Sequence, residues 1–292
     1  MHGYYDALTE IVAVVTGASR GIGEVIAQRL ARENAIVVLM GRDEVRLTAA
    51  VKRITDAGGQ AYALTLDVTD ASRVQRRFQE IIDQFGAIDL LVNNAGNMGP
   101  LGNTWEVNED QWWETINIHL RGGFLCMQEA LKWMIPHRQG RVINIVSHAG
   151  IYRWPTASAY SVAKAALIKL TENVAVEAKD SNVKVFALHP GIVIGAGLVS
   201  NLSATQAIEG SAHANLLAWV EKERLAGRSV SPSQSATQVL KLASGNYDAL
   251  NGRYLTVYDD FATLLAQAPL IRYSDALTLR LKPIDFSDPL DN

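Results

Sequence analysis

Seven short apolar runs, rich in β-branched residues, recur along most of this chain and are separated by longer helical patterns. Each run is apolar throughout instead of alternating between apolar and polar residues, which is typical of strands buried on both faces of a parallel sheet. Strands joined through helices form right-handed crossovers, so the pattern predicts a parallel sheet with helices on both faces. The predicted strands span residues 11–16, 35–40, 61–66, 88–92, 141–146, 183–188 and 253–257.

The helical patterns complete an α/β architecture. No Pro- or Ser-rich linker interrupts the series, so the sequence predicts one doubly wound, Rossmann-type domain over residues 1–258. Residues 195–230 depart from the rhythm and are predicted to be an insertion that forms a lid over the substrate. Residues 259–292 are predicted to be a C-terminal tail or cap. The predicted helices lie near residues 22–33, 44–57, 71–85, 109–134, 157–179 and 232–243.

The composition excludes several classes of protein. The formal net charge is −3 and there is no run of Lys or Arg, so the chain lacks the basic field that nucleic-acid binding needs. No apolar run approaches the roughly 20 residues of a membrane span, and residues 1–6 do not resemble a signal peptide. Cys126 is the only cysteine, and the six histidines lack metal-ligand spacing. We therefore expect a soluble, cytoplasmic protein without a metal, in which Cys126 is a buried, inert thiol.

A glycine-rich loop lies between the first predicted strand and the first predicted helix, where residues 16–23 read TGASRGIG. Glycines in such a loop let the backbone turn sharply and approach a pyrophosphate closely. The helix that follows contributes unpaired N–H groups and the positive end of its dipole. This order of strand, loop and helix predicts a dinucleotide site.

The end of the second strand indicates which nicotinamide cofactor binds. An acidic residue there favours NAD(H), whereas an arginine favours the 2′-phosphate of NADP(H). The strand ends in Gly41 and Arg42, with no carboxylate before Asp43, and Arg20 lies in the glycine loop. Because a guanidinium binds a phosphate dianion well, NADP(H) is favoured and NAD(H) stays the alternative. Asp67, after the third strand, either accepts from the adenine amino group or caps the next helix.

Tyr160 and Lys164 lie four residues apart on a predicted helix and therefore share one face. A free phenol has a pKa of about 10, and a nearby cation lowers it. Such a pair can exchange a proton with a carbonyl or an alcohol. Taken alone, the same spacing also fits an ordinary solvated helix face.

The chain resembles the short-chain dehydrogenase/reductase family in four motifs that occur in the family's order. The resemblance covers roughly residues 8–258, which is most of the chain. The four motifs are the glycine loop at 16–23, the run Asn93-Asn94-Ala95-Gly96 after the fourth strand, the pair Tyr160 and Lys164, and Pro190-Gly191 after the sixth strand.

The resemblance implies a role for each matching residue. Tyr160 would give a proton to a ketone or take one from an alcohol, and Lys164 would hold the nicotinamide ribose and lower the pKa of Tyr160. Ser147 would hydrogen-bond the substrate oxygen, and Asn117 would hold a water in the proton relay. The cofactor would contact Gly17, Ser19, Arg20, Gly21, Ile22, Gly23, Arg42, Asp67, Val68, Asn94, Ala95, Gly96, Tyr160, Lys164, Pro190, Gly191 and Val193.

Two departures from the family's pattern limit the resemblance. Ile194 stands where relatives usually have the threonine that bonds the nicotinamide carboxamide, so backbone groups or the cofactor's own phosphate must satisfy that amide. After the last strand, the chain lacks the glycine pair of many relatives and continues into a long tail. The resemblance implies a homo-oligomer, either a dimer or a tetramer. The tail puts in doubt the tetramer in which the last strands of two subunits pack together.

Residues that follow the strand ends are candidates for the substrate pocket, because ligands of open α/β sheets bind there. Met98, Trp154 and Leu198 are predicted to line this pocket. His148 directly follows Ser147, and neighbours along a strand point to opposite faces, so we expect His148 to point away from the substrate. No arginine is clearly committed to a substrate carboxylate or phosphate, which favours a moderately apolar substrate.

The sequence therefore predicts an NADP(H)-dependent oxidoreductase. It would move hydride between the nicotinamide and a carbonyl or secondary alcohol of a moderately apolar small molecule, with Tyr160 as the acid or base. Two alternatives stay open: an NAD-linked alcohol dehydrogenase of the same fold, and a non-catalytic NADP(H)-binding sensor. The sensor is disfavoured because the tyrosine, the lysine and the serine are all present.

Overall fold

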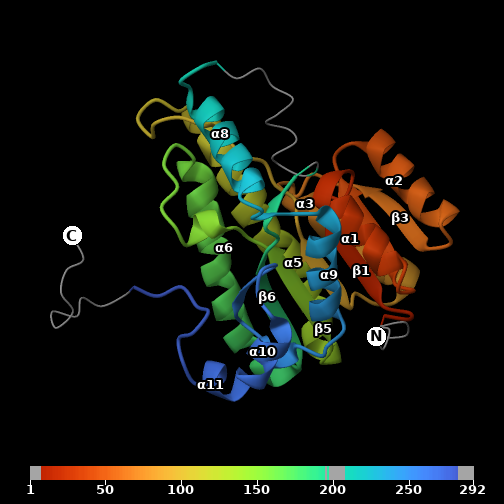
Figure 1. Ribbon diagram of the computed structural model, residues 1–292. Helices are drawn as coiled ribbons and strands as arrows, with labels where there is room; N and C mark the ends of the chain where they lie inside the picture. The colour runs from red at the N-terminus through yellow and green to blue at the C-terminus, as the bar shows by residue number, and fades with distance from the viewer. Residues whose placement is uncertain (1–7, 195, 197–207, 282–292) are drawn as a thin grey trace.

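The computed structural model describes residues 8–194, 196 and 208–281, and its centre is a parallel β-sheet (Figure 1). The strands of this sheet are β1 (Val12–Thr16), β2 (Ile36–Gly41), β3 (Gln60–Thr65), β4 (Leu90–Asn93), β5 (Gly140–Ile145), β6 (Val183–His189) and β9 (Tyr254–Thr256). They lie in the order β3-β2-β1-β4-β5-β6-β9, and each paired neighbour is parallel. Every one coincides closely with a predicted strand, so the predicted doubly wound fold is confirmed.

Helices cover both faces of the sheet, as Figure 1 shows. The layer on one face consists of α1 (Gly21–Ala31), α2 (Glu44–Asp56) and α9 (Pro232–Ala243). The layer on the other face consists of α3 (Ala71–Phe85), α5 (Gly122–His137) and α6 (Ser158–Glu177). Each layer packs its apolar side chains against the strands and forms a separate core.

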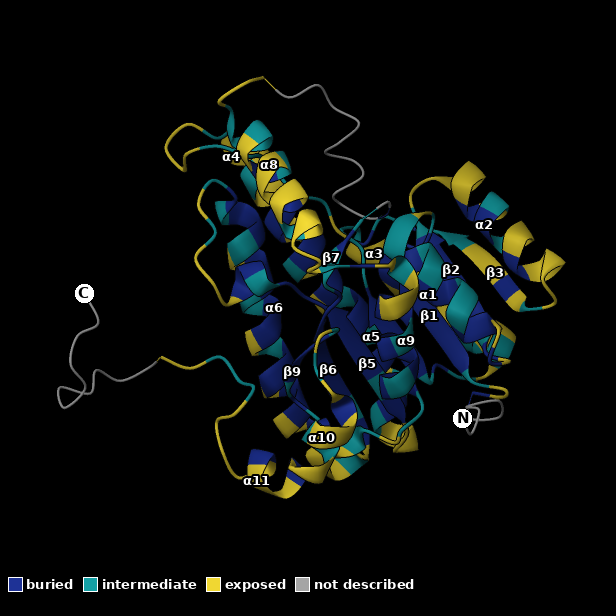
Figure 2. Cartoon of the chain, viewed as in Figure 1, coloured by how far each residue is buried: buried dark blue, intermediate teal, exposed yellow. Residues whose placement is uncertain are grey.

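The central strand β1 shows why the predicted strands are apolar throughout. Ala13 and Val15 belong to the core beneath α1, whereas Val12 and Val14 belong to the core on the opposite face. Successive side chains of a strand point to opposite faces, so a sheet covered on both sides needs an apolar residue at every position. Figure 2 shows the central strands as buried and the outer faces of the helices as exposed, whereas the edge strand β3 is partly exposed.

The helix predicted over residues 109–134 is interrupted. α4 (Glu109–Ile116) leads into a π-helical segment, Asn117–Arg121, and α5 begins at Gly122. A π-helical turn inside an α-helix frequently marks a functional site. This segment contains Asn117, which was predicted to be a site residue, and His119, a neighbouring histidine.

The predicted insertion after β6 is helical in its described part. The short strand β7 (Ile192–Val193) pairs with β8 (Ser229–Val230) in a separate two-stranded sheet, and α8 (Ala212–Leu225) lies between them in the sequence. In Figure 1, α8 lies at the top of the view. Residues 195 and 197–207, which include Leu198, lie outside the described residues.

The described part of the tail packs along the sheet edge formed by β9. Two short helices, α10 (Phe261–Ala266) and α11 (Ala268–Arg272), follow β9 and lie at the opposite end of the view from α8 (Figure 1). The backbone N–H of Tyr254 donates to the carbonyl of Leu277 over 2.8 Å, so the tail occupies part of the free edge.

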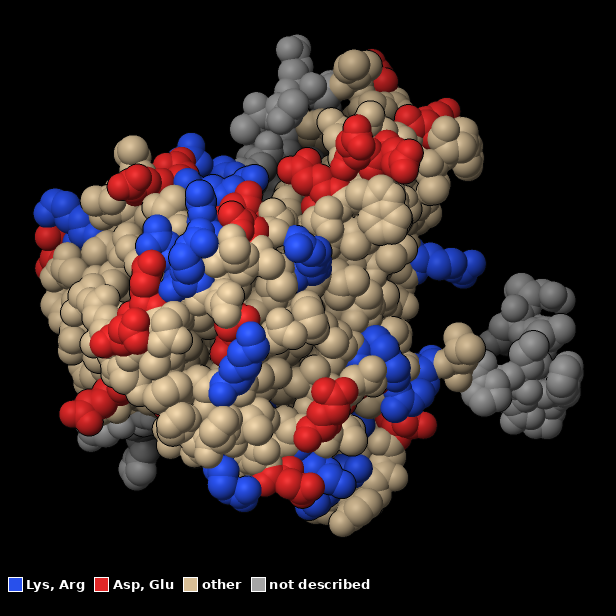
Figure 3. All heavy atoms as spheres, turned by 180° about the vertical axis from the view of Figure 1, so that it is seen from behind, with Lys and Arg blue, Asp and Glu red and all other residues tan. Residues whose placement is uncertain are grey.

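The surface agrees with the low net charge of the chain. On the face drawn in Figure 3, Lys and Arg side chains are interspersed with Asp and Glu. Within the described part of the chain, no helix combines the length and the apolar character needed to cross a membrane.

Candidate active site

A cavity of about 1070 Å³ lies beyond the C-terminal ends of the central strands. Its lining brings together the glycine loop, Ser147, Tyr160 and Lys164, and every residue predicted to contact the cofactor lines it. Small-molecule pockets usually have volumes of about 300–1,000 Å³, so this cavity has room for a dinucleotide and a second small molecule. It lies at the edge where open α/β sheets bind ligands.

The glycine loop has the geometry that a pyrophosphate needs. Gly17 has a φ of 65°, in the left-handed region that favours glycine. A Cβ atom at Gly23 would collide with the Asn94 side chain, which donates from Nδ2 to the carbonyl oxygens of Thr16 (2.9 Å) and Gly17 (3.2 Å). Arg20 precedes α1 in an extended conformation and gives its first turn no side-chain cap. The loop and the helix end therefore fit an anionic cofactor group.

A buried polar network holds the neighbouring strand ends in place. Asn93 on β4 donates from Nδ2 to Asn144 Oδ1 on β5 (2.9 Å) and to the carbonyl of Gly123 on α5 (3.0 Å). Asn144 in turn donates to Thr171 Oγ1 on α6 (2.9 Å). The network joins two strands to two helices behind the cavity, and buried polar groups linked in this way give the site a rigid frame.

The adenosine end of the cavity carries Arg42, Arg46 and two engaged carboxylates. Arg42 is exposed and lines the cavity at the end of β2. The Asp43 carboxylate caps α2, accepts from the Arg46 backbone N–H at 3.0 Å and pairs with the Arg46 guanidinium at 3.1 Å. Asp67 lines the cavity and accepts from the Thr69 N–H at 2.9 Å. The alternative that Asp67 caps the next helix is wrong, because Asp70 caps α3.

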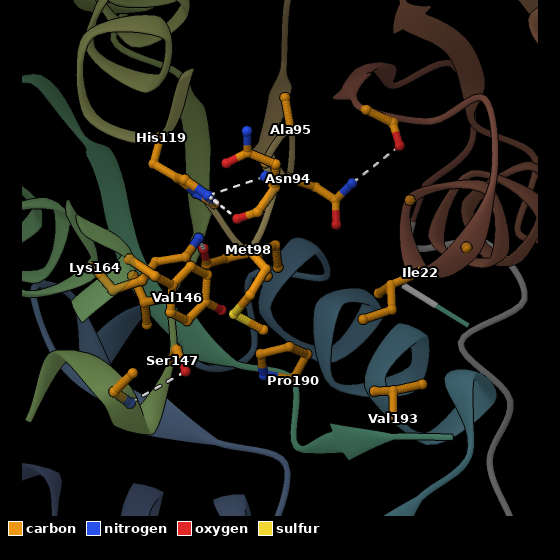
Figure 4. A pocket seen from close by; sticks show the side chains of 18 of the residues that line it. Ile22, Asn94, Ala95, Met98, His119, Val146, Ser147, Lys164, Pro190 and Val193 are labelled. Carbon is orange, nitrogen blue, oxygen red and sulfur yellow. Dashed lines mark hydrogen bonds between the residues drawn. The ribbon is translucent and has the colours of Figure 1, made fainter. Parts of the chain in front are cut away.

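The predicted catalytic side chains of Ser147, Tyr160 and Lys164 lie in one wall of the cavity. Lys164 Nζ lies 5.6 Å from the centroid of the Tyr160 ring and donates to the carbonyl of Ile145 at 2.6 Å. Ser147 Oγ accepts from the Ala149 N–H at 3.2 Å, which fixes the serine at the start of the turn after β5 (Figure 4). α6 thus supplies the phenol and the ammonium, and the end of β5 supplies the hydroxyl.

Burial governs the ionisation of this pair. It raises the pKa of Tyr160 to about 12, with Ser147 acting in the opposite direction. It also lowers the pKa of Lys164 to about 7. The expected lowering of the Tyr160 pKa by Lys164 is therefore not what the structure shows. At neutral pH Tyr160 is a protonated phenol, which is the form that can donate a proton.

The prediction that Asn117 belongs to the site is wrong. Asn117 is exposed and does not line the cavity, whereas His119, two residues further on, is buried and does. The Nε2 atom of His119 lies 2.7 Å from the Asn97 carbonyl oxygen and 3.1 Å from the Asn97 N. The ring also meets Tyr160 edge-on at 5.3 Å, and burial holds the pKa of His119 well below its ordinary value.

Helix geometry explains this error. Thr115, Ile118, His119 and Gly122 are buried and recur three or four residues apart, so they share the face that packs inward. Asn117 falls between them on the outer face. The same periodicity in the sequence could have selected His119 in place of Asn117.

The outer part of the cavity has an aromatic wall. Met98 and Trp154 line it, together with Trp219 from α8. The rings of Trp154 and Trp219 meet edge-on, with centroids 5.4 Å apart. Leu198, also predicted for this wall, lies outside the described residues, and Ile194 is half-buried without lining the cavity.

Two histidines at this wall were not expected there. His148 lines the cavity, so the expectation that it points away is wrong, and His189 at the end of β6 lines it as well. β5 ends at Ile145, and His148 begins a 3₁₀ turn, so the alternation of a strand no longer decides its direction.

Cys126 does not line the cavity. It is buried in α5, and burial raises the pKa of its thiol to about 12. A thiol that stays protonated is a poor nucleophile, which agrees with the predicted inert role.

The chain is similar to known proteins over most of its length. A family model for short chain dehydrogenases matches residues 11–207. The 3β-hydroxysteroid dehydrogenase of Mediterraneibacter gnavus is 32% identical over 265 residues, which cover 87% of this chain and 95% of that protein.

Solved structures of other enzymes share the fold of this chain. A variant of actinorhodin polyketide ketoreductase with NADPH has a TM-score of 0.78 at 29% identity and covers 86% of this chain and 97% of its own. A xylitol dehydrogenase bound to NAD⁺ has a TM-score of 0.76 at 26% identity, with coverage of 85% and 98%. The neighbours therefore include both forms of the nicotinamide cofactor.

Proposed function

The chain belongs to the short-chain dehydrogenase/reductase family and is an oxidoreductase that acts on CH–OH or C=O groups with NAD(P); from this premise we propose that it uses NADP(H) and that Tyr160 is its acid or base. The proposed substrate is a moderately apolar small molecule with a carbonyl or a secondary alcohol. One observation carries the proposal: Tyr160 and Ser147 lie in the wall of the same cavity that the glycine loop lines.

The chain's own residues have distinct tasks in the proposed reduction. When bound, the nicotinamide supplies hydride to the carbonyl carbon. Ser147 Oγ donates a hydrogen bond to the carbonyl oxygen and stabilises the negative charge that develops there. Tyr160 Oη gives its proton to the same oxygen, and the product is the alcohol. Lys164, with a pKa of about 7, is in the range to return a proton towards Tyr160 at neutral pH.

His119 acts in this proposal as a positioning residue, in place of Asn117. Its contact with the Asn97 backbone holds the loop after β4, and its ring packs edge-on against Tyr160 at 5.3 Å. A Cβ atom at Gly96 would collide with the His119 ring, so the loop and the helix are closely fitted here.

The preference for NADP(H) rests on the end of β2. The Arg42 side chain forms no hydrogen bond or ion pair within the described residues and lies at the adenosine end of the cavity. The Asp43 carboxylate, which would favour NAD(H), is already used to cap α2. A guanidinium facing the cavity and a carboxylate held by its own helix together support binding of a 2′-phosphate.

Self-association is part of the proposal. Trp113 on α4 and Phe124 on α5 are 53% and 41% exposed, so these helices offer apolar surface that a second subunit could cover. The hydrogen bond from the Tyr254 N–H to the Leu277 carbonyl of the tail occupies part of the β9 edge, which favours a dimer over an assembly that pairs last strands. Light scattering of the purified chain measures the assembly; a tetramer would contradict this preference.

A panel of ketones with NADPH or NADH tests the proposed function. We expect turnover with NADPH, and we expect Tyr160→Phe to lower kcat/KM by about 10²–10⁴-fold with NADPH affinity kept. Tyr273→Phe is the matched control, because Tyr273 is exposed and does not line the cavity. Unchanged turnover in Tyr160→Phe would remove Tyr160 from the mechanism. NADPH binding without turnover of any ketone or alcohol would favour the sensor.

A further inference from the structure

Two histidine rings stack on each other next to Ser147. His189 is the last residue of β6, and His148 follows Ser147 directly. Their ring centroids lie 4.0 Å apart at an interplanar angle of 28°. Both rings line the cavity, and the Tyr258 ring lies 6.1 Å from His189 and 6.2 Å from His148. The mechanism proposed for Tyr160 and Ser147 makes no use of this pair.

The inner ring is a buried polar group without a partner. His189 is only 5% exposed, and neither its Nδ1 nor its Nε2 has a hydrogen-bond partner within the described part of the chain. Buried polar groups are paired in most structures, and an exception at a cavity wall is a group that a ligand can satisfy. Two unpaired ring atoms at one position therefore mark a place for a polar group of the substrate.

The pair is uncharged at neutral pH. Burial, together with His148 and Lys164, lowers the pKa of His189 to about 3. Burial also lowers the pKa of His148, and Asp259 acts in the opposite direction. A neutral imidazole carries one N–H donor and one nitrogen acceptor. Two such rings suit an uncharged group that both donates and accepts, which is a hydroxyl, or an acceptor such as a keto oxygen.

The surroundings restrict the ligand further. Three of the four residues that α8 contributes to the cavity lining are apolar, namely Leu216, Trp219 and Val220. The fourth, Glu223, is held in an ion pair with Arg228. Ser147 and His148 are consecutive residues, whose Cα atoms are about 3.8 Å apart. Both residues line the same cavity, so one substrate can place one oxygen at Ser147 and a second at the histidines, with its remaining atoms against the apolar side chains of α8.

We propose that His148 and His189 form a second polar subsite that holds a hydroxyl or keto oxygen on a carbon next to, or one carbon removed from, the reacting carbonyl. The preferred substrates are then hydroxyketones, diketones or diols with an apolar body. This inference rests on the proposed function of the same cavity and adds the substrate class to it.

Matched substrates test the subsite. Cyclohexanone and 1-decalone are each compared with the 2-hydroxy ketone of the same ring system, with NADPH as the reductant. The variants are His189→Phe and His148→Phe, which keep a ring of similar shape and remove its nitrogens. His137→Phe on α5 is the matched control, since His137 is exposed and does not line the cavity. Thermal unfolding shows whether each variant folds. If His189→Phe does not fold, His148→Phe alone tests the subsite with the same pairs of substrates.

We expect the unmodified chain to prefer the hydroxyketone. We also expect each variant at the subsite to lower kcat/KM for the hydroxyketone by about tenfold, while kcat/KM for the simple ketone is unchanged. Equal losses on both substrates, or no preference in the unmodified chain, would overturn the subsite and leave the proposed function intact. If the unmodified chain binds NADPH and turns over neither ketone, the proposed function fails and the subsite fails with it.

Discussion

The cavity has a cofactor half and a substrate half that are built in different ways. The cofactor half consists of cavity-lining residues within 17–23, 41–46, 66–68 and 94–97, all directly after strands of the sheet. The substrate half consists of Met98, His189 and cavity-lining residues within 147–155 and 216–228, whereas Pro190, Gly191 and Val193 are predicted to contact the cofactor. In the cofactor half, backbone turns and glycines define the shape. In the substrate half, large side chains from separate segments, such as Trp154 and Trp219, meet only after folding.

This difference separates general binding from specific recognition. A backbone cradle fixed by Gly17 and by the bonds of Asn94 suits a cofactor shared by many enzymes. Side chains from the turn after β5 and from α8 can change without disturbing the sheet. Changes in one half should therefore affect cofactor affinity, and changes in the other half should affect turnover or substrate choice.

The largest effect after Tyr160→Phe is expected for Ser147→Ala. Ser147 provides the hydroxyl that stabilises charge on the substrate oxygen, so kcat/KM should fall by about 10²–10³-fold. Steady-state kinetics with a reactive ketone measures this, and NADPH titration serves as the control for the cofactor half. An equal loss of NADPH affinity would mean that the two halves are not separable.

Variants of His119 test its proposed role in positioning Tyr160 and the loop after β4. His119→Ala should lower kcat by about 10–100-fold, because small misplacements of a catalytic group are costly. His119→Asn, which keeps a hydrogen-bonding side chain for the Asn97 backbone, should recover part of that loss. Rescue by asparagine distinguishes positioning from a general loss of stability. Equal activity of the alanine variant and the unmodified chain would exclude the role.

Arg42→Ala tests whether the cofactor half selects NADPH over NADH through Arg42. Loss of a charge-assisted bond to the 2′-phosphate should weaken NADPH binding by about tenfold or more and leave NADH binding unchanged. Arg153→Ala is the matched control, because Arg153 lines the substrate half. Calorimetric titration of both cofactors gives the result. Equal weakening of NADH and NADPH would contradict the assignment of the 2′-phosphate to Arg42.

The last prediction concerns the pH dependence of stability and not activity. The pKa of Lys164 is lowered from 10.5 to about 7 in the folded chain. Between these values the unfolded chain binds a proton that the folded chain does not, so the unfolding free energy should rise with pH by up to about 1.4 kcal/mol per pH unit. Lys164→Met should remove this rise, whereas Lys132→Met, at an exposed lysine, should keep it. Urea unfolding across this range measures both; identical slopes would contradict the burial of Lys164.

Much of the fold and of the cofactor half could be predicted from the sequence because both depend on local patterns. Strands such as β1 are apolar at every position since both faces are covered. The loop from Gly17 to Gly23 carries its own backbone requirements. These constraints act between residues close together in the chain, so they are visible without coordinates.

The substrate half could not be predicted in the same way. Asn117 was chosen by residue type, but a π-helical turn and the inward helix face bring His119 to the cavity. The direction of His148 was predicted from strand alternation, but β5 ends before His148 and the residue lies in a 3₁₀ turn. The stacking of His148 on His189 joins the turn after β5 to the end of β6, which are distant in sequence, and only tertiary packing reveals such a pair.

A crystal structure of the chain with NADP(H) tests the division of the cavity most directly. Our account predicts the pyrophosphate at the glycine loop, the 2′-phosphate beside Arg42, and the nicotinamide next to Tyr160 and Lys164. The volume between Ser147, the two histidines and α8 should stay open for the substrate. A nicotinamide placed away from Tyr160, or a 2′-phosphate without contact to Arg42, would contradict it.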